Sequence, residues 1–255
     1  MIDTHSHIYL SDFDSDREKI IADALAAGVT NILLPNIDAE SINRMLSVES
    51  LFPNICKSMI GLHPSSVKND WVNKLKIIEK EMNRGNYIAI GEIGIDLYWD
   101  TTYANEQKEA LIKQFEWAKQ KSLPVVIHTR NAFNEIFDIL NKEYDTRLKG
   151  VFHSFSGSLE DALKIIEIPH FYLGINGTVT YKNSKLSDIL LKTGFEKLLL
   201  ETDAPYLPPV PYRGKRNEPS FLIKTAEKLA DIFSVSLTEI DRITTNNAEK
   251  LFNLI

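Results

Sequence analysis

Cysteine is almost absent from this sequence, and long hydrophobic runs are absent altogether. Cys56 is the single cysteine in 255 residues, so no disulfide can form within the chain and a reducing, cytoplasmic location is expected. We expect its side chain to be a small buried hydrophobic group rather than a catalytic thiol. No stretch approaches the roughly 20 apolar residues of a membrane-spanning helix, and no basic segment followed by an apolar one indicates a secretory signal. A membrane is therefore not expected as a partner.

Positive charge is also in short supply. The chain has 29 lysines and arginines against 35 aspartates and glutamates, which gives a formal net charge of −6. Proteins that coat nucleic acid by bulk electrostatics are usually basic, so that class of function is disfavoured. An enzyme that handles phosphodiesters in a pocket is still compatible with this charge, because bound metal ions can supply positive charge locally.

Neither linker-like nor low-complexity segments interrupt the chain, so a single domain over residues 1–255 is the simplest organisation. Short runs of aliphatic and β-branched residues recur along it, as expected for parallel strands that are buried on both faces. These runs predict eight strands, at about Ile2–His7, Asn31–Ile37, Ile55–His63, Tyr87–Ile95, Val125–Thr129, Gly150–Ser154, Phe171–Asn176 and Leu198–Asp203.

Helical patterns fill the segments between these strands. Ser15 and Glu18 fit a capping box at the start of a helix, and Gly28 follows the end of that helix. Apolar residues share one helical face in two later segments, namely Leu111, Phe115 and Ala118, and then Leu222, Ala226, Leu229 and Phe233. Eight alternating strand–helix units predict a closed (β/α)8 TIM barrel. The lack of a glycine-rich phosphate loop after the first strand disfavours an open doubly wound sheet.

Polar residues concentrate where barrel enzymes place their chemistry, at the carboxyl ends of the strands. Asp3, His5 and His7 alternate along the first strand and are therefore expected on one face of it. Five of the six histidines and two carboxylates occupy strand ends: His5, His7, His63, His128, His153, Glu92 and Asp203. Each alone could satisfy a core hydrogen bond or cap a loop, but together they predict a divalent metal site at one mouth of the barrel.

Even six of these seven residues are too many ligands for one catalytic ion that must keep an open position, but they fit two ions that share a carboxylate. Glu92 is the expected bridge. Paired ions activate a water molecule and stabilise the attacking and leaving oxygens, so the set indicates a hydrolase. Zinc, manganese and magnesium all suit a mixed imidazole and carboxylate set.

Eight sequence strings resemble, in the same order, those of the TatD family of metal-dependent deoxyribonucleases, which have amidohydrolase-type barrels. They are MIDTHSH, GLHP, GEIGIDLYW, LPVVIHTR, VFHSFSG, GINGTVTYKN, ETDAPYLPPVPYRGKRNEP and NNAEKLF. The resemblance covers nearly the whole chain. It implies a (β/α)8 barrel, a divalent metal site and hydrolysis of DNA phosphodiesters, often from the 3′ end. Two small departures are Ser6, where many relatives have cysteine, and Leu97 before Tyr98.

The resemblance also implies roles for the strand-end residues. One ion would be surrounded by His5, His7, Glu92 and Asp203, and the other by Glu92, His128 and His153. His63 would contact substrate rather than metal. We expect Glu92 and Asp203 to take part in the chemistry. Glu92 would bridge the ions, and Asp203 would bind one of them and accept a hydrogen bond from the attacking water.

A proline-bounded basic loop directly follows the eighth strand. We expect Arg213 and Lys215 to neutralise phosphate oxygens at the barrel mouth, and Arg216 to have no such role. The alternative is a solvated loop whose charges only interact with water. Asn217 and Glu218 are expected to hold the loop in place and cap the next helix.

Aromatic residues also lie just beyond the strand ends, at Tyr98, Trp99, Tyr181 and Tyr206. Exposed rings there can stack on nucleobases without reading their identity, and we expect Tyr98 and Tyr206 to contact substrate. Packing beneath a loop is the alternative for each ring.

Three functions compete on this sequence. The leading hypothesis is a two-metal 3′-to-5′ exodeoxyribonuclease that acts on DNA, with RNA left open as a substrate. The second is a hydrolase of a small cyclic amide, a phosphotriester or an aminoacyl ester on tRNA. Many such enzymes bridge their ions with a carboxylated lysine, and no lysine lies within the strand ends, which favours the nuclease. The third is a binding module without activity, which would require lost ligands, and none is lost. No obligate protein partner is evident.

Overall fold

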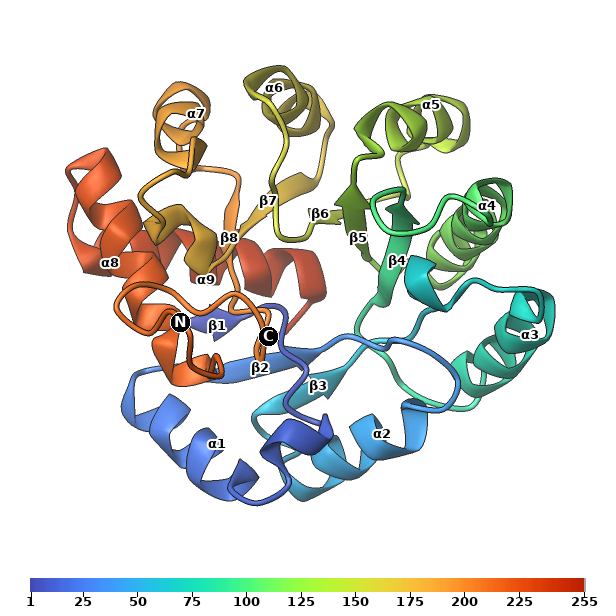
Figure 1. Ribbon diagram of the computed structural model, residues 1–255, viewed down its shortest axis with the longest axis horizontal. Coiled ribbons are helices and arrows are strands. Elements are labelled where there is room, and N and C mark those ends of the chain that lie inside the picture. Colours follow the sequence, from blue (N-terminus) through green and yellow to red (C-terminus); the bar gives the residue numbers. More distant parts are fainter. Residues whose placement is uncertain (255) are drawn as a thin grey trace.

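The computed structural model describes residues 1–254 and shows eight strands that alternate with helices around a central axis, followed by one further helix (Figure 1). The strands are β1 Ile2–Asp3, β2 Asn31–Leu34, β3 Cys56–Ser58, β4 Ile90–Asp96, β5 Val125–Arg130, β6 Gly150–Phe152, β7 Phe171–Ile175 and β8 Leu198–Leu200. The helices are α1 Arg17–Ala26, α2 Ile42–Leu51, α3 Trp71–Met82, α4 Ala104–Lys121, α5 Phe133–Glu143, α6 Leu159–Glu167, α7 Leu186–Thr193, α8 Leu222–Phe233 and α9 Leu237–Phe252. Short 3₁₀ turns add η1 Ser11–Phe13, η2 Pro64–Ser66, η3 Gly177–Thr180 and η4 Pro219–Phe221.

All strand pairing is parallel, and the sheet closes on itself. The strands pair in the orders β1-β2-β3 and β4-β5-β6-β7-β8. A bridge between Ile60 and Ile90 joins β3 to β4, and a bridge between Ser6 and Ala204 joins the segments that follow β1 and β8. The predicted (β/α)8 barrel is therefore confirmed. All eight predicted strands are present, although several end earlier than predicted because the ladder opens where their ends turn outward into loops.

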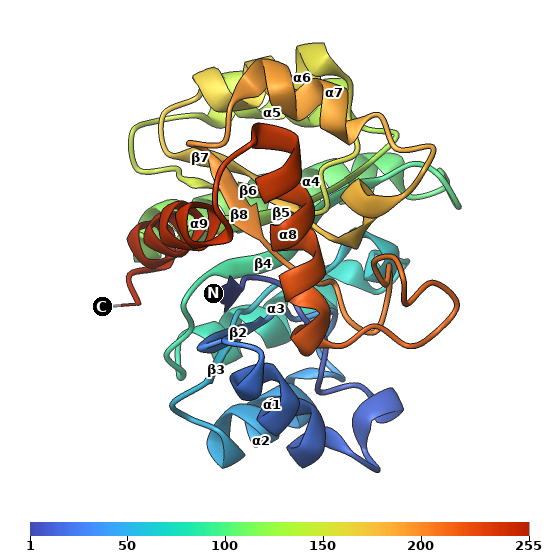
Figure 2. The same cartoon turned by 90° about the vertical axis from the view of Figure 1, so that its left-hand side faces the viewer.

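Apolar side chains from all eight strand regions fill one end of the barrel. Leu251 and Phe252 of α9 pack against Ile2, Leu33, Met59, Ala89, Val126, Val151, Tyr172 and Leu199. The helix thus closes the end at which the strands begin, and Figure 2 shows it on the opposite side from the loop that follows β8. The carboxyl ends of the strands, with their polar residues, meet at the opposite end of the barrel. We call this end the polar mouth.

The predicted helical faces are largely buried. Leu111, Phe115 and Ala118 are buried, as are Leu222, Ala226 and Leu229, whereas Phe233 is only partly buried. Gly28 follows α1 with a φ of +84°, a left-handed conformation that glycine adopts without steric cost. Cys56 is fully buried, and burial raises the pKa of its thiol to about 12, which confirms a structural role.

The predicted capping box at Ser15 and Glu18 is wrong. The first helix begins at Arg17, and the N-cap residue is Asp16, whose side chain caps no backbone group. Arg216, 200 residues away, binds both oxygens of the Asp16 carboxylate at 3.0 and 2.7 Å. This tertiary ion pair uses the acceptor that a local cap would need.

Over residues 1–254, no helix combines the length and the apolar character that crossing a membrane requires.

Gly94 allows β4 and β5 to approach each other beside the polar mouth. Its φ is +148°, and a Cβ atom added there would overlap the carbonyl oxygen of His128 on β5. Gly214, by contrast, has a φ of +84° and open space around the position of a Cβ. An alanine at either position would have to adopt a positive φ, but only an alanine at Gly94 would also clash with a neighbouring atom. Comparing the two substitutions therefore distinguishes the destabilisation caused by the positive φ from that caused by the clash.

Gly94→Ala should lower the free energy of unfolding by about 3–5 kcal/mol, because overpacking adds to backbone strain. The matched control Gly214→Ala should lose only about 1–2 kcal/mol from the left-handed backbone. Urea denaturation of both variants measures the difference, and equal losses would show that the β4–β5 contact at Gly94 is not tight.

Candidate metal centre

The two histidines of the N-terminal segment face each other at the polar mouth. Beyond β1 the chain continues extended, because Ser6 bridges Ala204. The Nε2 atoms of His5 and His7 lie 3.2 Å apart. Asp3, predicted on the same face, is not part of this pair, because its carboxylate accepts hydrogen bonds from the backbone and hydroxyl of Thr202 at 2.8 and 2.6 Å.

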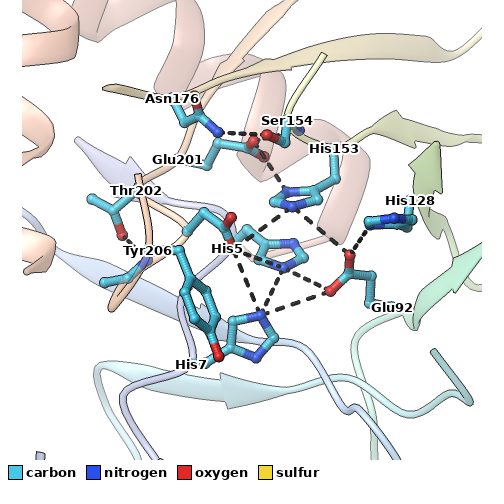
Figure 3. A network of polar contacts seen from close by, with 12 residues as sticks. His5, His7, Glu92, His128, His153, Ser154, Asn176, Glu201, Thr202 and Tyr206 are labelled. Atoms are coloured by element: carbon cyan, nitrogen blue, oxygen red, sulfur yellow. Dashed lines mark hydrogen bonds and ion pairs between the residues drawn. The ribbon is translucent and has the colours of Figure 1, made fainter. Parts of the chain in front are cut away.

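Glu92, from β4, lies between two sets of imidazoles (Figure 3). Its Oε2 atom is 3.1 Å from His5 Nε2 and 3.7 Å from His7 Nε2. Its Oε1 atom is 2.9 Å from His128 Nδ1, 3.3 Å from His63 Nε2 and 3.8 Å from His153 Nε2. The two carboxylate oxygens therefore face different histidines.

Asp203 is the second carboxylate of the cluster. Its Oδ1 atom lies 3.8 Å from His5 Nε2, 3.7 Å from His7 Nε2 and 3.8 Å from His153 Nε2. All six candidate ligands named from the sequence thus belong to one connected group. It contains three overlapping sets whose ligand atoms lie within 4.8 Å of one another: His5–Glu92–His153, His5–His7–Asp203 and His63–Glu92–His128.

Two rings have polar contacts on the side away from the cluster, a hydrogen bond for His7 and an ion-pair contact for His153. The Tyr9 hydroxyl donates to the carbonyl of Pro35 at 2.7 Å, so it accepts from His7 Nδ1 at 3.0 Å. This leaves a lone pair on His7 Nε2. His153 Nδ1 lies 3.1 Å from Glu201 Oε1, which turns its Nε2 toward Glu92 and Asp203. Such partners fix the tautomer and orientation of metal-binding histidines.

The donor set fits a divalent cation. Burial, together with neighbouring histidines, lowers the pKa of His5 and His7, so both rings are neutral near pH 7 and two ring nitrogens meet at 3.2 Å. Neutral imidazoles and carboxylates that converge in this way are the ligands that zinc and manganese prefer. A cation among these groups would bind the lone pair of His7 Nε2.

His63 makes a different kind of contact. The backbone amide of Ser65 donates to its Nδ1 at 3.1 Å, so in the neutral ring the proton is on Nε2, which points at Glu92 Oε1. A protonated ring nitrogen is a hydrogen-bond donor and offers no lone pair to a metal. This geometry supports the expectation that His63 is not a primary ligand.

The pKa values of the two carboxyl groups, Glu92 and Asp203, are shifted in opposite directions. Burial would raise the pKa of Glu92, but His63, His5 and His153 outweigh it and hold that pKa well below its ordinary value. Burial raises the pKa of Asp203 to about 7. Asp203 therefore takes up a proton much more readily than Glu92 does.

Asp96 and Glu201 complete the cluster, and sequence reasoning missed both. Asp96 Oδ2 lies 3.0 Å from His128 Nε2. Glu201 contacts His153, accepts from the backbone of Ser154 at 2.6 Å, and has a pKa raised to about 7 by burial. Both lie in strings already quoted, at the end of β4 and directly after β8. Every carboxylate at a strand end, rather than only those matching a ligand motif, should have been considered.

The loop after β8 is held in place by Asn217. Its side-chain amide donates to the carbonyls of Thr202 at 2.8 Å and Tyr206 at 2.6 Å, and the Tyr206 ring lies 6.1 Å from the ring of His7. The prediction that Glu218 caps the next helix is wrong. Its side chain makes no capping bond. It instead accepts a hydrogen bond from Arg216 at 3.2 Å, and the same arginine binds Asp16.

Cations lie over aromatic rings in the loops after the strands. The Arg213 guanidinium is 4.0 Å from the centre of the Tyr181 ring, and Lys215 is 5.9 Å from the Tyr212 ring. Arg130 lies 3.8 Å from the ring of Tyr98 and 5.2 Å from that of Trp99. Tyr98, Trp99 and Tyr206 are each at least half exposed.

The titration of this cluster predicts how stability depends on pH in chelator-treated protein. Burial raises the pKa of Asp3, Glu201 and Asp203 to about 7. For His128, hydrogen bonds to Asp96 and Glu92 outweigh burial and raise the pKa to about 9. Groups with raised pKa bind more protons folded than unfolded, so stability falls as pH rises from the unfolded to the folded pKa, which lies at about 7 for the carboxyl groups and at about 9 for His128.

The free energy of unfolding of chelator-treated protein should therefore fall between pH 7 and pH 9, by an amount on the order of 1–3 kcal/mol. A saturating divalent ion should reduce this fall, because it favours the deprotonated ligands. Urea denaturation at several pH values, with and without the ion, measures both effects. Stability that stays constant or rises over this range after chelation would contradict the assigned pKa shifts.

Comparison with known proteins extends the likeness seen in the sequence. Residues 2–253 match the family described as TatD related DNase. The chain is 36% identical over 261 residues to the uncharacterized metal-dependent hydrolase YabD of Bacillus subtilis (strain 168), with 100% of this chain and 99% of that protein covered. The crystal structure of YjjV, a TatD homolog from Escherichia coli K12, superposes with a TM-score of 0.93 at 32% identity, covering 99% of this chain and 98% of that one.

More distant structures share the fold alone. An uncharacterized amidohydrolase from Saccharomyces cerevisiae has a TM-score of 0.82 at 20% identity, with 98% of this chain and 99% of that chain covered. The family match over nearly the whole chain, the relatives above 30% identity and the cluster of imidazoles and carboxylates at the barrel mouth agree with one another. This chain belongs to the TatD family and is a metal-dependent hydrolase.

Proposed function

We propose that this protein is a deoxyribonuclease that removes nucleotides from the 3′ ends of DNA with a two-metal site bridged by Glu92. The observation that carries the proposal is the division of the Glu92 carboxylate, with His5 and His7 near one oxygen and His128 and His153 near the other. A carboxylate whose two oxygens face different imidazoles is suited to holding two cations at a short separation.

Each proposed ion has its own ligands. His5, His7, Glu92 and Asp203 would hold the first, and Glu92, His128 and His153 the second. Bound ions would supply the positive charge that makes a water molecule acidic and stabilises the developing charge on phosphate oxygens. Magnesium, manganese and zinc all remain compatible with this ligand set.

We assign to Asp203 the role of the general base that accepts a proton from the attacking water. Its Oδ1 atom contacts the histidines, and we assign its Oδ2 atom to accept a hydrogen bond from the water. A carboxylate can accept the proton of a water molecule that a bound ion has made acidic. Glu92, whose pKa is held low, stays ionised and serves as a ligand.

The surroundings of the cluster favour a nucleic acid over a small amide or ester. Exposed rings at Tyr98, Trp99 and Tyr206 can stack on bases. Arg213 and Lys215 make no ion pair with any residue in the range 1–254, so both are free to meet phosphate oxygens. His63, as a donor beside Glu92, is positioned to contact a substrate oxygen.

End-labelled single- and double-stranded DNA should be shortened progressively from the 3′ end by protein loaded with magnesium, manganese or zinc. Exhaustive chelation should abolish cleavage, and the divalent ion should restore it, because the proposed ions supply the charge that the chain lacks. Gel analysis of a time course follows the products. A parallel panel of lactams, phosphotriesters and aminoacyl esters tests the other hydrolase chemistries. Full activity after metal removal, or turnover of the panel without DNA cleavage, would overturn the proposal.

Variants of the two carboxylates should separate their roles. Glu92→Gln should lower both metal content and rate, because a neutral amide bridges two cations poorly. Asp203→Asn should reduce single-turnover cleavage by about 10²–10⁴-fold while at least one ion stays bound. Metal content by mass spectrometry is measured beside cleavage. Full double occupancy in Glu92→Gln, or near-normal cleavage in Asp203→Asn, would refute the respective assignment.

A further inference from the structure

A second polar site lies at the end of the barrel opposite to the metal cluster. It is a pocket of about 310 Å³ between the starts of β6 and β7 and the last turn of α9. Its walls are formed by Ser122, Thr146, Arg147, Lys149, His170, Tyr172, Lys250 and Leu251. The metal cluster lies beyond the carboxyl ends of the strands, so the barrel core separates the two sites.

Positive charge is concentrated in this pocket, although the chain as a whole has a net charge of −6. Three cations and His170 line it, and no carboxylate does. Arg147 is partly neutralised by Asp145, which accepts from it at 2.8 Å. Lys149 and Lys250 have no ion-pair partner within residues 1–254. Unbalanced like charges repel one another, so an anion bound among them would be favoured.

The pKa of a further lysine, Lys197, is affected by this repulsion. Lys197 precedes β8, and its ammonium group lies 5.8 Å from the centre of the Tyr172 ring that lines the pocket. Burial lowers the pKa of Lys197, and the charge of Lys250 lowers it further. Two cations are therefore close enough to disfavour each other's charged forms, and an anion would reverse this effect.

The pocket also offers hydrogen-bond donors. The hydroxyls of Ser122, Thr146 and Tyr172 accompany the cations around a space that suits a small molecule. His170, immediately before β7, has a φ of +63°, a conformation that is uncommon for residues other than glycine. Cations combined with hydroxyl donors, without acidic groups, match the oxygens of a phosphate.

We propose that this pocket binds a small anion that carries one or two phosphate groups, such as pyrophosphate or a nucleoside monophosphate. The site is separate from the metal centre and does not depend on the proposed nuclease activity. Because its residues come from the α4–β5 and α5–β6 connections, β7 and α9, the bound anion joins elements that pack at the closed end of the barrel. Binding should therefore stabilise the folded protein.

The test is calorimetric titration and thermal unfolding of the full-length chain, both loaded with a divalent ion and after chelation. The ligands are pyrophosphate, deoxyadenosine monophosphate and, as the uncharged control, deoxyadenosine. We expect saturable binding of the two phosphates after chelation, a rise in Tm above that given by sodium chloride of equal ionic strength, and no effect of deoxyadenosine. A stronger effect of the nucleotide than of pyrophosphate would identify the nucleoside phosphate as the preferred class, and the reverse would identify the free anion.

The variant Lys149→Ala/Lys250→Ala should weaken binding by at least about tenfold, because it removes two charge-assisted contacts. The matched control is Lys76→Ala/Lys192→Ala, which removes the same charge from two exposed helix positions without ion-pair partners in the described chain and should bind as wild type does. If phosphate binding were weakened equally in both variants, the effect would come from the net charge alone, and the proposed site would be wrong. A Tm response no larger than that to chloride, or binding that disappears on chelation, would overturn it as well.

Discussion

The burial of one carboxylate among imidazoles from several strands is the constraint on which the polar mouth depends. Glu92 is 3% exposed, and an ionised carboxylate in such a place is unfavourable unless other groups compensate its charge. Here the compensation comes from histidines that belong to the N-terminal segment and to the regions around β3, β5 and β6. Closure of the barrel brings these segments together, so the integrity of the site and of the fold are linked.

Three of these histidines contact a further polar group. Tyr9 holds His7, Glu201 contacts His153 and Asp96 contacts His128. Gly174 belongs to this arrangement as well, because a Cβ atom there would overlap the carboxylate of Glu201. A site prepared in this way has little left to reorganise when a cation enters, which is how a rigid scaffold raises metal affinity.

The two ends of the barrel carry opposite electrostatic characters. Carboxylates and imidazoles gather where the strands end. Lysines without an ion-pair partner among residues 1–254 gather where the strands begin, around α9. The first end suits cations and the second suits anions. The small net charge of the whole chain is therefore a poor guide to either site, because it averages two local surpluses of different sign.

The sequence by itself determined the barrel and six members of the polar mouth. Strand periodicity, alternation with helices and the placement of His5, His7, Glu92, His128, His153 and Asp203 at strand ends required no contact information, because parallel strands must bring their carboxyl ends together. Only the tertiary structure decided which nitrogen of each ring faces the cluster, since that choice depends on partners such as Tyr9 and Glu201. It also displaced the expected cap of the first helix, because Arg216 reaches Asp16 from 200 residues away. Contacts between residues far apart in the chain leave no local periodicity, and so the basic pocket and the partners of the histidines became visible only after folding.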